Sequence, residues 1–116
     1  MIQLTPQHKI FICLEPIDFR KGIDGIASIC KNQMDIDPFS GIVCAFTNKR
    51  RIMVRLLIYD GTGFWLCSKR FSEGKLKWWP ATSEQAELVT PIQLQIILQQ
   101  SDPRLVKLKS NWRKLE

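Results

Sequence analysis

Two runs of strand-forming residues on either side of a short turn cluster constrain the fold of this chain more than any other feature. The runs, residues 52–59 and 64–71, are rich in β-branched and aromatic side chains, and Asp60-Gly-Thr-Gly63 lies between them. Strand formers that flank a short glycine-containing cluster are typical of a β-hairpin. We therefore expect an antiparallel ribbon near the middle of the chain.

The length of the turn predicts which side chains share each face of this hairpin. A four-residue loop places Tyr59 opposite Phe64, and side chains then alternate between the faces. One face, expected to be a core, carries Ile52, Val54, Leu56, Ile58, Trp65 and Cys67. The other carries Met53, Arg55, Leu57, Tyr59, Phe64, Leu66, Ser68 and Arg70. Aromatics mixed with arginines are typical of sheets that bind single-stranded nucleic acid, although the same aromatics would equally pack under a helix.

Positive charge is concentrated around the hairpin. Residues 48–79 carry eight basic and two acidic side chains, and the rest of the chain carries nine of each, so this region accounts for the whole formal net charge of +6. A local excess of positive charge indicates an anionic partner, most commonly nucleic acid; the alternative is that it only maintains solubility. The predicted nucleic-acid-binding residues are Lys49, Arg50, Arg51, Arg55, Lys69, Arg70, Lys75, Lys77 and Trp78.

These residues have two expected roles. The lysines and arginines would contact phosphates, while Arg55 and Trp78 would add stacking or base-edge contacts. Trp78 and Trp79 also have a structural interpretation, in which at least one of the two indoles closes the end of the core.

Composition and cysteine spacing narrow the class of protein. The 116 residues, 45% of them hydrophobic, suffice for a single domain with one core. Four widely separated cysteines form no C-x-x-C pair and His8 is the only histidine, so we expect buried free thiols, no metal site and no cofactor. The N-terminus lacks the features of a signal peptide, and no window approaches the roughly 18 apolar residues of a membrane span. A cytoplasmic protein that does not enter membranes is expected.

The segments before the hairpin predict two strands and a helix. Residues 9–14 and 42–47 are short apolar runs typical of strands. Between them, an apolar stripe over residues 18–32 predicts a helix with Asp18 as its N-cap. The Gly22-x-x-Gly25 pair within that helix indicates close packing against a sheet, or access of a ligand to the backbone.

After the hairpin, the pattern predicts a polar connection over residues 81–89 and a helix over residues 91–100, with Thr90 as its N-cap and Pro91 at its first position. Residues 1–103 are assigned to one domain and residues 104–116 to a basic C-terminal tail. The expected fold is α+β, a single domain in which an antiparallel β-meander sheet, built on the hairpin and its flanking strands, carries two packed helices.

Aspartates are the candidates for an enzymatic site. Those that could in principle gather around a metal are Asp18, Asp24, Asp35, Asp37 and Asp60. Aspartates beside proline and glycine far more often build Asx-type turns, so we predict no catalytic residue and no enzymatic activity.

Six segments together resemble a known family. They are Ile17-Asp-Phe-Arg-Lys-Gly-Ile-Asp-Gly25, Asp37-Pro-Phe-Ser-Gly41, Phe46-Thr-Asn-Lys-Arg-Arg51, Leu56-Leu-Ile-Tyr-Asp-Gly-Thr-Gly-Phe-Trp65, Lys69-Arg-Phe-Ser-Glu-Gly74 and Trp79-Pro80. In this order they resemble the small accessory proteins, often called TnpB, of the insertion sequence 66 family of bacterial transposable elements. Tyr59 stands where that family commonly has tryptophan, and the tail after Pro103 has no motif that can be assigned.

The resemblance implies a protein encoded beside a DDE-type transposase and needed for transposition, without catalytic residues to carry over. Nothing here corresponds to the much longer RNA-guided nucleases that share the name TnpB. The leading hypothesis is a non-enzymatic accessory protein that binds the DNA of element ends, or the DNA–transposase complex, through the basic β-hairpin. The alternative is a protein-interaction module that docks the transposase through the hydrophobic hairpin face, Trp78 and Trp79, without direct nucleic-acid contact. The sequence leaves the oligomeric state open, including a homodimer.

Overall fold

The central hairpin forms in the register that the sequence predicts. In the computed structural model, β3 (Met53–Tyr59) pairs antiparallel with β4 (Phe64–Arg70), and Tyr59 lies opposite Phe64. The predicted division into two faces is also confirmed, because alternate residues of β3 enter two different cores. The expectation that Trp65 belongs to a core is wrong, because this side chain is 42% exposed. Local turn length was therefore sufficient to determine this register.

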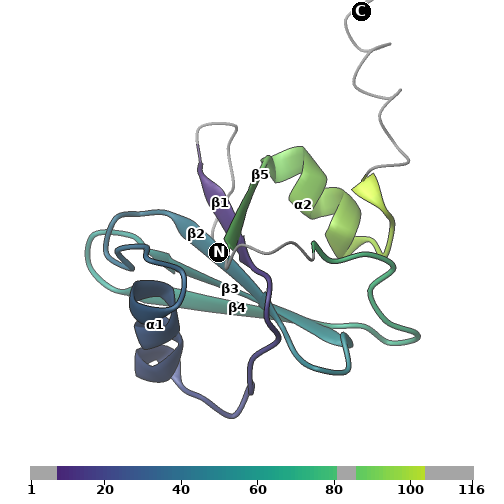
Figure 1. Cartoon of the computed structure of the whole chain (residues 1–116), viewed down its shortest axis with the longest axis horizontal. Helices are drawn as coiled ribbons and strands as arrows, with labels where there is room; N and C mark the ends of the chain where they lie inside the picture. The colour runs from purple at the N-terminus through teal and green to yellow at the C-terminus, as the bar shows by residue number, and fades with distance from the viewer. Residues whose placement is uncertain (1–7, 81–85, 104–116) are drawn as a thin grey trace, which may run out of the picture.

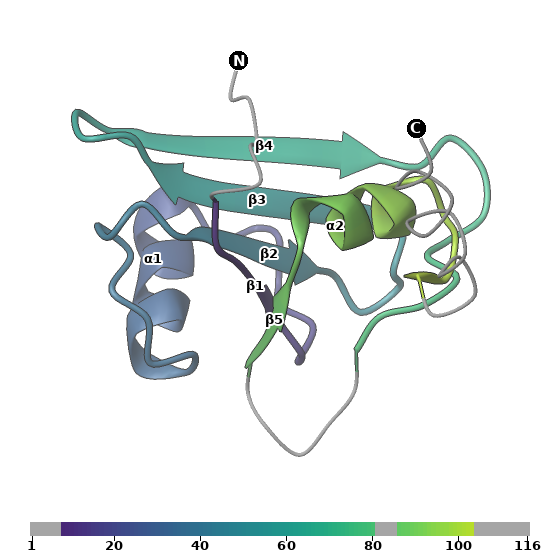
Figure 2. The same ribbon diagram turned by 90° about the horizontal axis from the view of Figure 1, so that it is seen from above.

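Three further strands complete a mixed sheet, so the predicted antiparallel meander is wrong in one respect. β2 (Val43–Thr47) runs antiparallel to β3, whereas β1 (Ile10–Cys13) lies parallel beside β2, and β5 (Ala86–Val89) runs antiparallel to β1. The strand order is β4-β3-β2-β1-β5, as Figure 2 shows. A sequence pattern indicates that a strand exists but not which neighbour it joins, so the parallel pair escapes prediction.

The structure describes residues 8–80 and 86–103. The predicted polar connection over residues 81–89 is wrong at its C-terminal end, which forms β5. Pairing with β1 stabilises this short strand, whose sequence Ala-Glu-Leu-Val has no alternation strong enough to predict it. The rest of the connection and the predicted tail at 104–116 lie outside the described residues, so the division into domain and tail stays a prediction.

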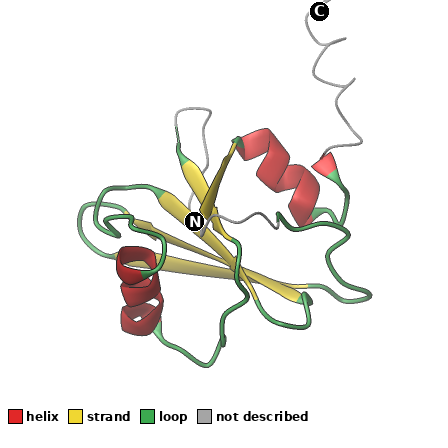
Figure 3. Cartoon of the chain, viewed as in Figure 1, coloured by secondary structure: helices red, strands yellow, loops and turns green. Residues whose placement is uncertain are grey.

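Two helices cover opposite faces of the sheet, as Figures 1 and 3 show. The core beneath α2 (Pro91–Leu98) includes Ile12, Val54, Trp79, Leu94 and Ile97. The core beside α1 (Ile23–Asn32) includes Ile26, Cys30, Cys44, Phe46 and Leu57. Because successive strand residues point to opposite faces, the central strands supply both cores at once.

Helix α1 begins four residues later than the predicted N-cap at Asp18 implies. Its N-cap is Gly22, and Asp18 instead accepts hydrogen bonds from the Arg20 backbone N–H at 2.9 Å and from its guanidinium at 2.7 Å. A side chain that closes a local turn is no longer available to cap a helix, which explains the later start. The expected close packing of the two glycines on the sheet is also wrong, because a side chain at Gly22 would meet no atom within 4 Å and one at Gly25 would first meet Lys21.

Thr90 is the N-cap of α2 and Pro91 is its first residue, as predicted. Thr90 Oγ1 accepts a hydrogen bond from the Gln93 N–H at 3.1 Å, and the Gln93 side chain accepts one from the Thr90 N–H at 2.9 Å. This capping box satisfies two helix-terminal donors and fixes the start of the helix. Its last residue is Leu98, two residues before the predicted end.

Three of the four cysteines, Cys13, Cys30 and Cys44, are buried free thiols, and Cys67 is half-buried. Burial raises the pKa of Cys13 to about 11, so this thiol stays protonated near neutral pH. Within residues 8–80 and 86–103, no three His, Cys, Asp or Glu side chains are grouped so that they could hold a metal ion. No described helix has the length and apolarity needed to cross a membrane.

Candidate nucleic-acid interface

Six of the predicted nucleic-acid-binding side chains lie at one end of the sheet, which we call the basic end. They are Lys49, Arg50, Arg51, Arg70, Lys75 and Lys77. The β2–β3 turn and the loop after β4 meet there, because Arg70 pairs with Met53 and the Leu76 N–H donates to the Arg51 carbonyl at 2.9 Å. Figure 2 shows this turn and this loop at one end of the sheet and the β3–β4 turn at the other.

The β2–β3 turn is closed by backbone groups and one asparagine. The Arg51 N–H donates to the Asn48 carbonyl at 3.0 Å, and Asn48 Oδ1 accepts from the Ile52 N–H at 3.1 Å. Arg51 has a φ of 60°, in the left-handed region that is costly for a residue with a Cβ. Lys49 and Arg50 take no part in closing the turn, and both side chains are exposed.

The loop after β4 is anchored so that its lysines face solvent. Leu76 is buried in the core beneath α2, and Lys75 and Lys77 on either side of it are exposed. From the end of α2, the Gln100 side-chain amide donates to the carbonyls of Glu73 at 2.9 Å and Lys75 at 3.2 Å. These contacts hold the backbone that carries both lysines.

The adjacent tryptophans have different environments. Trp79 is 3% exposed, and its indole N–H donates to the Cys13 carbonyl at 3.0 Å. It therefore closes the core, as was predicted for one of the two, and it is not available for docking a partner. Trp78 is half-buried against the same core, so its predicted binding role depends on its accessible part.

The positive charge of the basic end is not neutralised within the described part of the chain. The one ion pair recorded there joins Arg20 to Asp18 at 2.7 Å. Hydrogen bonds from the Arg20 guanidinium, and then from its backbone N–H, lower the pKa of Asp18 to about 2. The six cations of the basic end form no ion pair with a carboxylate among these residues. The loop after β4 carries one acidic residue, the exposed Glu73, so most of their positive charge is available to an external anion.

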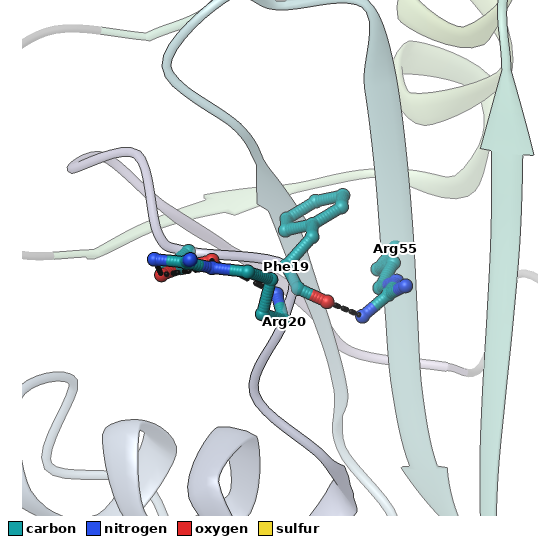
Figure 4. Close-up of polar contacts among 4 residues, drawn as sticks. Phe19, Arg20 and Arg55 are labelled. Atoms are coloured by element: carbon teal, nitrogen blue, oxygen red, sulfur yellow. Dashed lines mark hydrogen bonds and ion pairs between the residues drawn. The ribbon is translucent and has the colours of Figure 1, made fainter.

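The other two predicted cations serve the structure itself. The Arg55 guanidinium donates to the Phe19 carbonyl at 2.6 Å (Figure 4). It also donates to Ser68 Oγ at 2.9 Å and lies 4.7 Å from the centroid of the Phe19 ring. Lys69 Nζ donates to the Leu98 carbonyl at 2.7 Å, at the C-terminal end of α2. Arg55 and Lys69 therefore each keep fewer hydrogen-bond donors for a phosphate than the cations of the basic end do.

An open groove of about 620 Å³, which we call the β1–β2 groove, lies beside the basic end. One wall is the loop after β1, residues 16–20, and the other is the β2–β3 turn with part of β3. The Ile17 N–H donates to the Thr47 carbonyl at 3.0 Å and so joins that loop to the end of β2. The charged residues that line the groove are Arg20, Lys49, Arg50, Arg55 and Asp18.

The groove is a consequence of the parallel pairing of β1 and β2. The carboxyl ends of parallel neighbours lie at the same edge of a sheet, so the loops that follow the two strands meet. Sequence reasoning placed the strands in an antiparallel sheet and did not find Phe19 and Arg20 as site residues. One signal in the sequence could have indicated these residues, because both loops belong to the segments that carry the family resemblance.

The opposite end of the sheet, which we call the aromatic end, consists of Phe39, Tyr59, Phe64 and Trp65. Phe39 is 60% exposed, and its ring centroid lies 5.0 Å from that of Tyr59 and 5.2 Å from that of Phe64. Trp65 pairs across the strands with Ile58 on the other face of the sheet and is 42% exposed. Exposed aromatic groups of this kind are frequent at protein–protein contacts.

Asp60 organises the turn at the aromatic end. Its carboxylate accepts hydrogen bonds from the N–H and hydroxyl of Thr62, both at 2.9 Å, from the Gly63 N–H at 3.0 Å and from the Trp65 indole at 2.7 Å. These bonds, those from Thr62 first, lower the pKa of Asp60 to about 2. Asp37 similarly accepts from the Phe39 N–H at 2.9 Å. Both aspartates are therefore turn residues, as predicted.

Residues 8–107 match the model of a family described as IS66 Orf2 like protein. The uncharacterized protein y4jC of Sinorhizobium fredii is 28% identical over 101 residues, which cover 87% of this chain and 86% of that protein. The uncharacterized protein y4hO of the same organism is 25% identical over 96 residues, 83% of each chain. No solved structure matches the chain significantly.

Proposed function

The chain belongs to the IS66 Orf2-like family, and from this premise we propose that it acts without catalysis in transposition by binding DNA through its basic end. Membership associates it with an accessory role in the transposition of insertion sequence 66 elements. To this role the proposal adds a direct contact between the basic end and DNA. DNA of the element ends, bare or held by the DDE-type transposase, lies across the β2–β3 turn and the loop after β4.

The single observation that supports this contact is the set of six cations at the basic end, all of which are exposed except the half-buried Arg51. Six lysines and arginines from three segments converge there, and none of them forms an ion pair with a carboxylate of the described residues. Their backbone is held by Asn48 and Gln100, so little ordering is needed when a phosphate binds. Contacts of this kind position a protein on nucleic acid but carry no sequence information.

The test measures how binding depends on salt. Six phosphate contacts give a slope of log K against log salt of about −5 on duplex DNA, so affinity should fall by about a thousandfold between 50 and 200 mM salt. The probe is a labelled duplex of an element end, followed by fluorescence anisotropy. A Lys49→Gln, Arg50→Gln variant should flatten the slope by about 2.

The matched control is Lys9→Gln with Lys31→Gln, which removes the same charge from exposed sites outside the basic end. The control should keep the wild-type slope. An affinity that barely responds to salt, or a control that weakens binding as much as the basic-end variant, would reject the proposed contact.

The aromatic end supports a second candidate function, docking of the transposase without nucleic acid. The buried Trp79 cannot contribute, but Phe39 and Trp65 are exposed. A pull-down of the transposase that survives nuclease treatment, is lost in Phe39→Ser and persists in the Lys49→Gln, Arg50→Gln variant would support this function. Loss of the complex on nuclease treatment would contradict it.

A further inference from the structure

The β1–β2 groove has a composition that phosphate binding alone does not require. Pro16, Ile17, Phe19 and Met53 give it apolar walls, and Ile17 is buried while Phe19 and Met53 are half-buried. Charge and N–H donors suffice for a phosphate, and apolar walls add nothing to its binding. A ligand that uses the whole groove therefore combines an apolar body with an anionic group.

Phe19 and Arg55 form a fixed pair that lines this groove. The Arg55 guanidinium lies 4.7 Å from the Phe19 ring centroid and is held by the Phe19 carbonyl and Ser68, as Figure 4 shows for the first of these bonds. Aromatic rings and guanidinium planes are the groups against which unstacked nucleobases pack. Because two hydrogen bonds already hold the guanidinium, this surface is ordered before a ligand arrives.

We propose that the β1–β2 groove holds an unstacked base of single-stranded DNA against the Phe19–Arg55 pair. The exposed Lys49 and Arg50 contact the phosphates on either side of that base, whereas the Arg20 guanidinium in the same groove is already paired with Asp18. The volume of about 620 Å³ lies within the range of roughly 300–1,000 Å³ that is usual for pockets holding small organic molecules. A base inside a duplex is stacked and paired and cannot enter, so the protein prefers a single strand.

This inference rests on the proposed function and narrows it, since the basic end alone would accept any polynucleotide. It also places a base contact next to the phosphate contacts. The partner is then a region of element DNA whose strands are separated.

The experiment compares three labelled probes of about 12 nucleotides by fluorescence anisotropy. They are a single strand of mixed sequence, the corresponding duplex, and a single strand of abasic sites that has the phosphates but no bases. The wild-type protein should bind the base-bearing strand roughly tenfold more tightly than either other probe. Phe19→Leu, which keeps apolar volume but removes the ring, should abolish most of this difference and leave the affinities for the duplex and abasic strand unchanged.

Phe11→Leu is the control. Phe11 packs, like Phe19, against the core beside α1, but it does not line the groove. It should retain the preference for the base-bearing strand. If the wild-type protein binds the base-bearing and abasic strands with equal affinity, the inference is wrong, whatever the variants show. The proposed function survives that result if Lys49→Gln with Arg50→Gln weakens binding to both strands. Failure of all three probes to bind at low salt overturns the proposed function and this inference together.

Discussion

The two ends of the sheet use their polar side chains in opposite ways. At the aromatic end, the Asp60 carboxylate accepts four hydrogen bonds from its own turn and from Trp65. At the basic end, backbone groups and Asn48 close the turn, and Lys49 and Arg50 form no hydrogen bond with any described residue. A charged side chain in a turn therefore indicates a binding function only where it forms none of the hydrogen bonds that close the turn.

The apolar side chains show the reverse difference. The loop at the basic end buries Leu76 and Trp79 in the core beneath α2, whereas the aromatic end leaves Phe39 and Trp65 accessible. The same hairpin thus presents charge at one end and aromatic surface at the other. The two proposed contacts, with DNA and with the transposase, would therefore use separate surfaces.

The largest expected effect separates binding from folding at the basic end. Replacement of Lys49, Arg50, Lys75 and Lys77 by glutamine removes four phosphate contacts and should weaken duplex binding by about a hundred- to a thousandfold at moderate salt. The melting temperature should not fall, because none of these side chains forms a hydrogen bond or ion pair in the described part of the chain. Anisotropy titration and thermal melting measure the two quantities. A large loss of stability would show that these cations are structural.

The converse effect is expected at the aromatic end. Asp60→Ala leaves the Thr62 and Gly63 N–H groups and the Trp65 indole without their acceptor, so the melting temperature should fall by several degrees. DNA affinity should stay close to that of the wild type, since the turn lies at the other end of the sheet. Arg50→Ala is the matched control and should stay within about 0.5 kcal/mol of wild-type stability. Equal destabilisation by both substitutions would remove the distinction between the ends.

Acid should act through Asp60 at the aromatic end and through Asp18 in the β1–β2 groove, whose pKa is likewise lowered to about 2, but not through the six cations of the basic end. The pKa of Asp60 is lowered to about 2 in the folded protein, below its ordinary value of 3.8. A carboxyl with a lowered folded-state pKa stabilises the fold above its unfolded pKa, and this stability is lost as pH falls towards the folded value. Stability should therefore decline as pH falls from about 4 to about 2, and less steeply in Asp60→Asn.

Denaturant unfolding at a series of pH values measures this decline. Arg50→Gln should keep the wild-type profile, because no bond to Arg50 depends on a carboxylate in the described residues. An Asp60→Asn profile parallel to that of the wild type would mean that Asp60 does not contribute to the acid dependence.

The smallest effect concerns the backbone of the basic end. Arg51 has a φ of 60°, so Arg51→Gly relieves left-handed strain and should raise the free energy of unfolding by about 0.5–1 kcal/mol. DNA binding should weaken only a few-fold, since one cation of six is lost. Arg50→Gly in the same turn is the control and should not stabilise, because its φ is not positive. Stabilisation by both glycines would exclude strain at Arg51 as the cause.

Local chemistry along the chain was sufficient to predict much of this molecule. The length of the Asp60–Gly63 turn determines the hairpin register, and Thr90 is the N-cap that fixes the start of α2. The concentration of lysine and arginine identifies the basic end. These features depend on neighbours within a few residues, and such interactions are present in any local stretch of the sequence.

Only the tertiary structure decided the parallel pairing of β1 with β2, the strand β5 and the burial of Trp79. Each depends on which distant segment supplies a hydrogen-bond partner or an apolar surface, and hydrophobic pattern alone does not specify that choice. The β1–β2 groove has the same origin. Phe19 and Arg55 are separated by 36 residues in sequence, and the fold joins them through a 2.6 Å hydrogen bond.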